Sequence, residues 1–153
     1  MKISEILHRD AVVESLGAVT KREVLFELVE PLSRLHAELD QDRTVNILLE
    51  REKLGSTGVG EGIAIPHGKT PGLNEVIVSF GRSVQGVDFD ALDGKPVHLF
   101  FLLMAPEGCA GSHLKALAKI SRMLKDVPFR NRLMEARSAA ELYRAIADQD
   151  DLC

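Results

Sequence analysis

Val97-His98-Leu99-Phe100-Phe101-Leu102-Leu103-Met104 is an almost unbroken apolar stretch, interrupted only by His98. A strand that is buried on both faces has this pattern, whereas a strand with one wet face alternates. The stretch is far shorter than the roughly 18 residues needed to span a bilayer. It therefore predicts a central strand of a covered sheet, in which His98 is a hydrogen-bonded core residue. The branched and aromatic residues over 76–80 predict a second central strand.

Helical patterns occur before and after these strands. Thr20 and Ser138 each open a capping box, with a glutamate three residues later. Pro31 is expected to kink the first of these helices or to mark its end. A helix is expected over residues 44–54, ended by Gly55. Another is expected from the cap residue Ser112 onward, and a short one over residues 129–136. Strands between helices predict an α/β fold, a mixed β-sheet sandwiched by α-helices, in one domain over residues 1–153.

Composition excludes several classes of protein. The 153 residues carry a formal net charge of -4, and no basic run with interleaved aromatic residues predicts a nucleic-acid surface. Residues 1–9 have the spacing of a helix and lack the pattern of a secretion signal, and no segment predicts membrane insertion. Cys109 and Cys153 cannot form a disulfide framework, so we expect a cytoplasmic protein.

Residues 55–69, Gly-Ser-Thr-Gly-Val-Gly-Glu-Gly-Ile-Ala-Ile-Pro-His-Gly-Lys, hold four glycines within eight residues, beside Ser56 and Thr57. Glycines allow backbone N–H groups to converge on an anion, and the two hydroxyls add donors. Such a stretch on its own is more often a loop of tight turns. Beside a histidine that follows a proline, it indicates phosphate handling.

Nucleotide binding is the first form of phosphate handling to test. Gly68-Lys69-Thr70 resembles the end of a P-loop, but five residues rather than four separate Gly62 from Gly68. Pro71 and Gly72 also prevent the helix that such a loop opens. Residues 58–62 lack the dinucleotide-binding spacing as well. We therefore expect neither ATP nor NAD, and no cofactor.

His67 is the candidate catalytic residue. Residues 63–65 predict a short strand, and Pro66 directs the chain so that His67 emerges, exposed, at its end. Neutral imidazole is a competent nucleophile, and with an ordinary pKa near 6.5 roughly three-quarters of an exposed histidine is neutral at pH 7. We interpret His67 as a residue that takes a phosphoryl group from one protein and hands it on.

His113 and Arg51 are the candidate assistants. At a helix start the positive end of the dipole opposes protonation of His113, so a neutral N–H donor could bind a phosphoryl oxygen or orient His67. Arg51 presents a planar fork that can pair with two phosphate oxygens. Taken alone, His113 would more often be a helix-start residue satisfied by the backbone, and Arg51 a solvated charge.

Ser56, Thr57 and Gly68 complete the predicted phosphate-binding set. No metal is expected, because a phosphohistidine donor is already activated and transfer then needs only positioning and charge stabilisation. Cys109 and His113 have the spacing of half a metal site and lack further ligands at suitable spacing.

Three motifs together resemble a known family. They are Arg51-Glu52-Lys53-Leu54-Gly55-Ser56-Thr57-Gly58, Gly62-Ile63-Ala64-Ile65-Pro66-His67-Gly68 and His113-Leu114. Over about residues 3–147 the chain resembles the fructose/mannitol-type enzyme IIA domain of the bacterial phosphotransferase system, and most of all its nitrogen-regulatory branch. The resemblance implies a mixed sheet flanked by helices and a phosphocarrier rather than an enzyme that turns over a small molecule.

The resemblance also implies partners and roles. An HPr-type phosphocarrier, NPr-like in this branch, would phosphorylate His67, at Nε2, with help from His113 and Arg51. The phosphorylation state would control targets such as potassium transporters and sensor kinases. Position 61, commonly Asn in the nitrogen branch, is Glu61 here and is expected to add negative charge near the phosphate.

Two alternatives stay open. The chain could be a sugar-pathway IIA component that passes the group to a fructose- or mannitol-specific IIB domain, which the chemistry at His67 does not distinguish. It could also be a non-catalytic docking module that uses the glycine-rich loop only to recognise an anion. Failure to accept a phosphoryl group would favour the second alternative.

Overall fold

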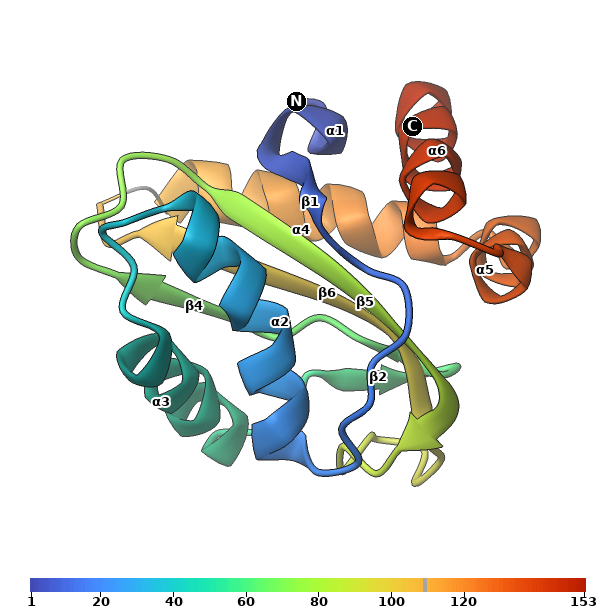
Figure 1. Cartoon of the computed structure of the whole chain (residues 1–153), viewed down its shortest axis with the longest axis horizontal. Helices are drawn as coiled ribbons and strands as arrows, with labels where there is room; N and C mark the ends of the chain where they lie inside the picture. The colour runs from blue at the N-terminus through green and yellow to red at the C-terminus, as the bar shows by residue number, and fades with distance from the viewer. Residues whose placement is uncertain (109) are drawn as a thin grey trace.

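Six strands form one mixed sheet at the centre of the molecule (Figure 1), in a computed structural model that describes residues 1–108 and 110–153. The sheet order is β1-β5-β6-β3-β2, and β4 also pairs with β6. β1 runs parallel to β5, β5 antiparallel to β6, and β3 and β4 parallel to β6. The strands are β1 (Leu7–Val13), β2 (Gly58–Gly60), β3 (Ile63–Ala64), β4 (His67–Thr70), β5 (Ile77–Val87) and β6 (Val97–Pro106).

β6 is the central strand that its apolar sequence predicts. Every residue of β6 is buried except His98, which is half-buried. The Nδ1 atom of His98 lies 2.8 Å from the Ser83 carbonyl oxygen, so the predicted hydrogen bond is present. β5 and β6 lie side by side, which confirms the expected centre of the sheet.

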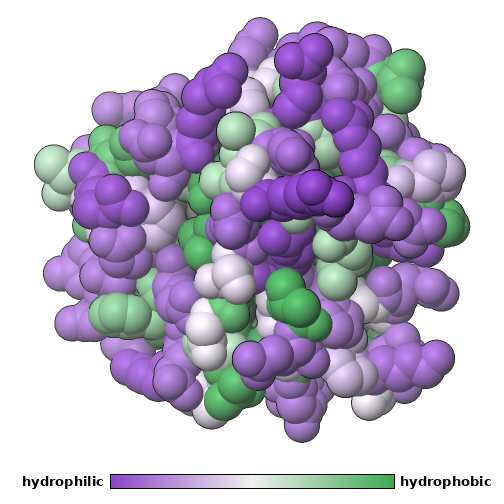
Figure 2. Space-filling model, turned by 45° about the vertical axis from the view of Figure 1, so that its right-hand side comes forward, coloured by the Kyte–Doolittle hydropathy of each residue, from purple (hydrophilic) through white to green (hydrophobic). Residues whose placement is uncertain are grey.

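Helices cover both faces of the sheet, as predicted. They are α1 (Ile3–Ile6), α2 (Lys21–Leu35), α3 (Gln41–Lys53), α4 (Ala110–Leu124), α5 (Val127–Glu135) and α6 (Ala139–Leu152). α2 and α3 lie on one face, while α4 and α5 lie on the other, and α6 packs against β1 and α5 (Figure 1). Within the described residues no helix is both long and apolar enough to cross a membrane. The face in Figure 2 is largely hydrophilic, with small scattered apolar spots.

The two predicted capping boxes are confirmed at their hydroxyls. The side chain of Thr20 accepts a hydrogen bond from the Glu23 N–H at 3.3 Å, and that of Ser138 accepts one from the Glu141 N–H at 3.1 Å. These contacts satisfy N–H groups that the first turn of a helix leaves without partners. Each cap therefore begins its helix where the sequence predicts.

One predicted helix start is wrong, and one of the two outcomes expected for Pro31 is excluded. Pro31 does not end α2, which continues to Leu35, because a proline inside a helix removes only one hydrogen bond and α2 is held by its buried face. Ser112 is not a cap, since α4 begins at Ala110 and Ser112 is its third residue. Cys109 lies outside the described residues. His113 still falls within the first turn of α4.

The strands that prediction missed or shortened are polar. Residues 7–13 form β1 rather than a continuing helix, and β5 extends to Val87 through Arg82. Arg82 is buried, and its guanidinium donates to the carbonyl oxygens of Glu14, Leu133 and Ala136. It therefore caps the C-terminal end of α5 from within the sheet, where a helix end favours a cation.

Candidate functional site

His67 is the first residue of β4, rather than an exposed residue at the end of β3. β3 and β4 follow one another along the same side of β6, with Ile63 opposite Leu99 and His67 opposite Leu103. Pro66 separates them because it has no N–H to give to the ladder, although its carbonyl accepts from the Leu103 N–H at 2.9 Å. The sheet thus holds His67 on a rigid element.

The His67 ring has one tautomer that fits its surroundings. Its Nδ1 lies 2.9 Å from the Ile65 carbonyl oxygen. A carbonyl oxygen can only accept, so Nδ1 carries the proton and Nε2 keeps a lone pair. Burial lowers the pKa of His67, the Arg51 charge lowers it further, and the Ile65 carbonyl and Glu52 oppose the change. The half-buried ring is therefore even more fully neutral at pH 7 than the exposed histidine that we expected.

His113 lies beside His67, as predicted from two distant segments. The ring centroids are 5.4 Å apart at an interplanar angle of 76°, an edge-to-face contact between α4 and β4. His113 is only 6% exposed, and its Nδ1 has no hydrogen-bond partner within residues 1–108 and 110–153. Burial lowers the pKa of His113, and His67 and Lys69 lower it further. His113 is thus a neutral imidazole with hydrogen-bonding capacity to spare.

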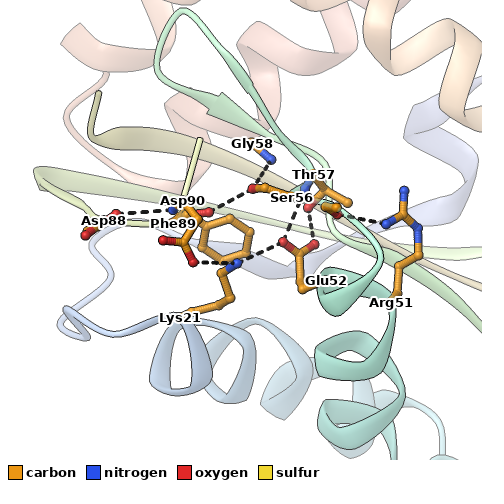
Figure 3. A network of polar contacts seen from close by, with 10 residues as sticks. Lys21, Arg51, Glu52, Ser56, Thr57, Gly58, Asp88, Phe89 and Asp90 are labelled. Atoms are coloured by element: carbon orange, nitrogen blue, oxygen red, sulfur yellow. Dashed lines mark hydrogen bonds and ion pairs between the residues drawn. The ribbon is translucent and has the colours of Figure 1, made fainter. Parts of the chain in front are cut away.

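Two cations act on this pair of histidines. Arg51 lies in the last turn of α3, and its Nη1 donates to the Gly55 carbonyl oxygen at 2.9 Å (Figure 3). Lys69 stands two residues after His67 on β4, so the two side chains share one side of the strand. Sequence reasoning missed Lys69 because it placed His67 at a strand end. Side chains two residues apart lie on the same side of a strand, and this alternation along β4 is the signal that could have identified Lys69.

Ser56 and Thr57 use their hydroxyls within the protein (Figure 3). The Thr57 hydroxyl donates to the buried carboxylate of Glu52. The Ser56 hydroxyl donates to the Phe89 carbonyl oxygen at 2.8 Å and accepts from the Gly58 N–H at 3.0 Å. Each hydroxyl has one proton, and it is already committed here. The predicted contact of these residues with phosphate stays a prediction, and the structure gives them a supporting place behind the site.

Gly68 has a packing reason to be glycine. A Cβ atom at this position would lie 3.0 Å from Cγ2 of Ile47 on α3. That separation is below an ordinary van der Waals contact, so a side chain would force α3 away from β4. Gly68 therefore brings the helix that carries Arg51 close to the strand that carries His67. Its predicted role as a phosphate donor is untested.

The glycines over residues 58–62 build a hairpin rather than an anion cradle. β2 and β3 are antiparallel, and Glu61 and Gly62 between them have φ of 59° and 75°. Two successive residues with positive φ are the hallmark of a type I′ turn. The Glu61 N–H donates to Asp93 at 3.2 Å, and the Glu61 carboxylate lies 3.7 Å from Arg130 on α5.

The expectation that Glu61 adds negative charge near the phosphate is wrong. The partners of Ile63 and His67 on β6 are Leu99 and Leu103, which lie four positions apart, or about 13 Å along the strand. Glu61 lies beyond Ile63, in the turn before β3. The sequence separation of six residues is short, but an extended chain carries the side chain away from the site.

Replacing Glu61 with asparagine should raise the free energy of unfolding by about 0.5–1 kcal/mol, because asparagine tolerates the left-handed region better than other residues with a Cβ. The measurement is urea unfolding at pH 7. Glu61→Gln is the control, since it removes the charge and leaves the backbone strain. Equal stabilisation by both variants would show that the charge, and not the turn, sets the cost.

Comparisons with known proteins agree with this geometry. The family model described as "Phosphoenolpyruvate-dependent sugar phosphotransferase system, EIIA 2" matches residues 5–149. A nitrogen regulatory protein of Bradyrhizobium diazoefficiens is 40% identical over 147 residues, which are 96% of this chain and 95% of that protein. The fructose-specific EIIABC component of Bacillus subtilis is 38% identical over 150 residues, which are 98% of this chain and 24% of that protein.

Solved structures share the fold. Nitrogen regulatory protein IIA-Ntr from Neisseria meningitidis superimposes with a TM-score of 0.87 at 38% identity, covering 94% of this chain and 98% of that one. IIA mannitol from Escherichia coli superimposes with a TM-score of 0.76 at 24% identity, covering 92% and 98%. The mixed sheet between helical layers is common to both.

Proposed function

Because the chain belongs to the EIIA 2 family of the phosphoenolpyruvate-dependent sugar phosphotransferase system, we propose that it accepts a phosphoryl group on Nε2 of His67 from an HPr-type phosphocarrier. The observation that carries this proposal is the bond of the His67 Nδ1–H to the Ile65 carbonyl oxygen, which leaves Nε2 as the nucleophile. The half-buried, neutral ring is ready to react without a general base.

The transfer is a direct exchange between two imidazoles. The Nε2 lone pair of His67 attacks phosphorus, a new N–P bond forms as the donor's N–P bond breaks, and the donor imidazole leaves with that electron pair. The proton of His67 stays on Nδ1, hydrogen-bonded to the Ile65 carbonyl oxygen. Arg51 and Lys69 offset the charge of the transferred group, and His113 donates to a phosphoryl oxygen. Within this proposal, catalysis consists of positioning and charge stabilisation.

Docking of the donor has a surface to use. Leu54, just after the helix that bears Arg51, is 84% exposed, and Leu114, next to His113, is 65% exposed. Exposed leucines beside a reactive group favour contact with a partner protein, since apolar side chains supply much of the energy of an interface core. A carrier protein that brings its own phosphohistidine would cover both.

We infer a regulatory role in a nitrogen-type relay, with targets such as potassium transporters and sensor kinases, in the cytoplasm. Support comes from the nitrogen regulatory protein of B. diazoefficiens, which matches this chain over nearly its full length. Phosphorylation adds about -1.5 to -2 charges to a small patch, so a target contacting the His67 face would bind the two states differently. Equal affinities for both states would contradict this part of the proposal.

A second candidate is a sugar-pathway IIA protein that hands the group to a IIB domain. The fructose-specific component of B. subtilis favours it, because that protein is almost as similar to this chain as the nitrogen regulatory protein is. The two functions differ in the acceptor and not in the first step. Incubating the phosphorylated chain with a fructose-type IIB domain separates them, since rapid loss of the phosphoryl group is expected only in the sugar pathway.

The first step is tested by intact-mass spectrometry of the purified chain after incubation with phosphoenolpyruvate, enzyme I and an HPr-type carrier. The expected result is a gain of one phosphoryl mass that acid removes, since phosphohistidine is acid-labile. Omitting the carrier is the control and should abolish the gain. A chain that gains no mass with any carrier would instead fit the docking module.

A further inference from the structure

A buried carboxylate lies directly behind the candidate site. Glu52 is 7% exposed at the end of α3 and accepts three hydrogen bonds (Figure 3). The donors are the Thr57 N–H at 3.2 Å, the Thr57 hydroxyl and the Lys21 ammonium at 3.3 Å. Only an ionised carboxylate accepts all three without needing an acceptor of its own. The Lys21 charge offsets the cost of burying it.

The contacts of Lys21 and Ser56 connect residues 88–90 to the surroundings of Glu52. The Lys21 Nζ also lies 3.2 Å from Asp90 and 4.8 Å from the centre of the Phe89 ring. The Ser56 hydroxyl donates to the Phe89 carbonyl oxygen. α2, α3 and residues 55–58 and 88–90 therefore meet in one polar network around the Glu52 side chain, as Figure 3 shows.

The same network holds Arg51. Its Nη1 donates to the Gly55 carbonyl oxygen at 2.9 Å, while the Gly55 N–H donates to the Glu52 carbonyl oxygen at 3.1 Å. Thr57 lies two residues after Gly55, and its N–H and its hydroxyl both donate to the Glu52 carboxylate. The position of the Arg51 guanidinium thus depends on a loop that the neighbouring carboxylate anchors.

We propose that Glu52 is a positioning residue for phosphoryl transfer: by anchoring residues 55–58 it sets the Gly55 carbonyl, and through that carbonyl it sets the guanidinium of Arg51 beside His67. This inference rests on the proposed function of His67. Glu52 itself does not touch the phosphoryl group, since Lys21 and Thr57 occupy its oxygens. A shift of about 1 Å in a positioning group can cost 100-fold in rate.

The test is the rate of phosphoryl transfer from a limiting HPr-type carrier to variants of the full chain. Glu52→Gln keeps the size of the side chain and loses the carboxylate, and it should slow transfer roughly tenfold or more. Thr57→Val, which lacks the hydroxyl donor, should also slow transfer, and Thr57→Ser should restore it. Asp90→Asn is the matched control, because the Asp90 carboxylate is exposed and pairs with Lys21 rather than with residues 55–58, and it should stay within about twofold of wild type.

A double-mutant cycle tests whether Glu52 acts through Arg51. If it does, adding Glu52→Gln to Arg51→Ala should slow transfer by less than about twofold more, because the guanidinium to be positioned is already gone. If the double variant is instead slowed by the product of the two single factors, Glu52 acts independently of Arg51 and the proposal is overturned. Circular dichroism at the assay temperature checks that every variant is folded.

An NMR titration of His67 gives a readout that does not need the donor. The charges that face His67 are Arg51 and Glu52, with His113 packed against its ring and Lys69 beside His113. Loss of the Glu52 charge should lower the pKa of His67, since the carboxylate favours the imidazolium, whereas Asp90→Asn should leave it unchanged. An unchanged pKa of His67 in Glu52→Gln, or normal transfer by that variant beside an active wild type, would overturn the proposed role of Glu52 and leave the proposed function of His67 intact. A wild type that gains no phosphoryl group would overturn the function as well.

Discussion

Replacing His67 with alanine is expected to abolish the acid-labile gain of mass completely, because this ring supplies the only proposed bond to phosphorus. His113→Ala should keep the gain but slow it by roughly 100-fold, the typical cost of removing one donor to a developing charge. Intact-mass time courses with a limiting HPr-type carrier measure both effects.

His8→Ala is the matched control for these variants. His8 is exposed on β1, an edge strand that β5 and β6 separate from β4, which carries His67, and its loss should leave the time course unchanged. A phosphoryl group that persists on His67→Ala would place the modification elsewhere and overturn the proposal. An unchanged rate in His113→Ala would limit His113 to packing against His67.

The tautomer of His67 adds a sharper expectation about the product. Since Nδ1 keeps its proton and donates it to the Ile65 carbonyl oxygen, only the Nε2-phosphorylated isomer should form. NMR of the phosphorylated protein, labelled with nitrogen-15 in histidine, distinguishes the two ring isomers. Nδ1 phosphorylation would require the bond to Ile65 to break, and finding it would contradict the geometry of the site.

Replacing Lys119 with methionine is expected to lower the free energy of unfolding by about 3–5 kcal/mol, the usual cost of removing one member of a buried ion pair. The Lys119 ammonium on α4 lies 2.6 Å from the Asp150 carboxylate on α6, and the two side chains are 8% and 0% exposed. Asp150 also accepts from the N–H groups of Ile3 and Ser4 at 3.0 and 2.9 Å. The change would leave this carboxylate buried without its cation.

Urea unfolding at pH 7 measures this loss, with Lys53→Met as the control. Lys53 pairs with Glu50 at 2.8 Å, but both side chains are about 70% exposed, so the same substitution there should cost under about 1 kcal/mol. Similar losses for the two variants would contradict the assignment of Lys119 and Asp150 as the pair that ties α4, α6 and the N-terminal residues together.

The same pair predicts a dependence of stability on pH. Burial acts to raise the pKa of Asp150, but the hydrogen bonds from Lys119, Ser4 and Ile3 outweigh it and hold the pKa below its ordinary value. The unfolded chain therefore binds a proton at Asp150 more readily than the folded chain. The stabilisation is complete above about pH 4, the ordinary value for aspartate, and is lost as the pH falls through the lower folded value. Asp150→Asn should flatten this acid limb of the stability curve.

Local patterns predicted much of this protein correctly. The apolar run of β6 determined the centre of the sheet, because a strand buried on both faces has no need of polar residues. The capping boxes at Thr20 and Ser138 determined where α2 and α6 begin, since a cap acts within one turn of its own helix. Pro66 directly before His67 is another local pattern, and it indicated the candidate nucleophile.

Long-range contacts decided what those patterns could not. β1 is a strand because it pairs with β5, and the polar part of β5 can be buried because Arg82 finds carbonyl oxygens at the end of α5. Local propensity does not encode these partners. Glu61 lies far from the candidate site because of the register of β3 and β4 on β6. The Thr57 hydroxyl that prediction aimed at phosphate is held by Glu52.

The sequence by itself therefore determined the fold class, the starts of α2 and α6 and the identity of the candidate residues His67, His113 and Arg51, since all of these depend on residue type and short spacing. Only the tertiary structure decided that His113 packs on His67, that Nδ1 of His67 binds the Ile65 carbonyl, and that Lys69 belongs beside them. The physical reason is that the pKa of a ring, its tautomer and its neighbours depend on burial and on partners distant in the chain, which spacing along the sequence does not specify.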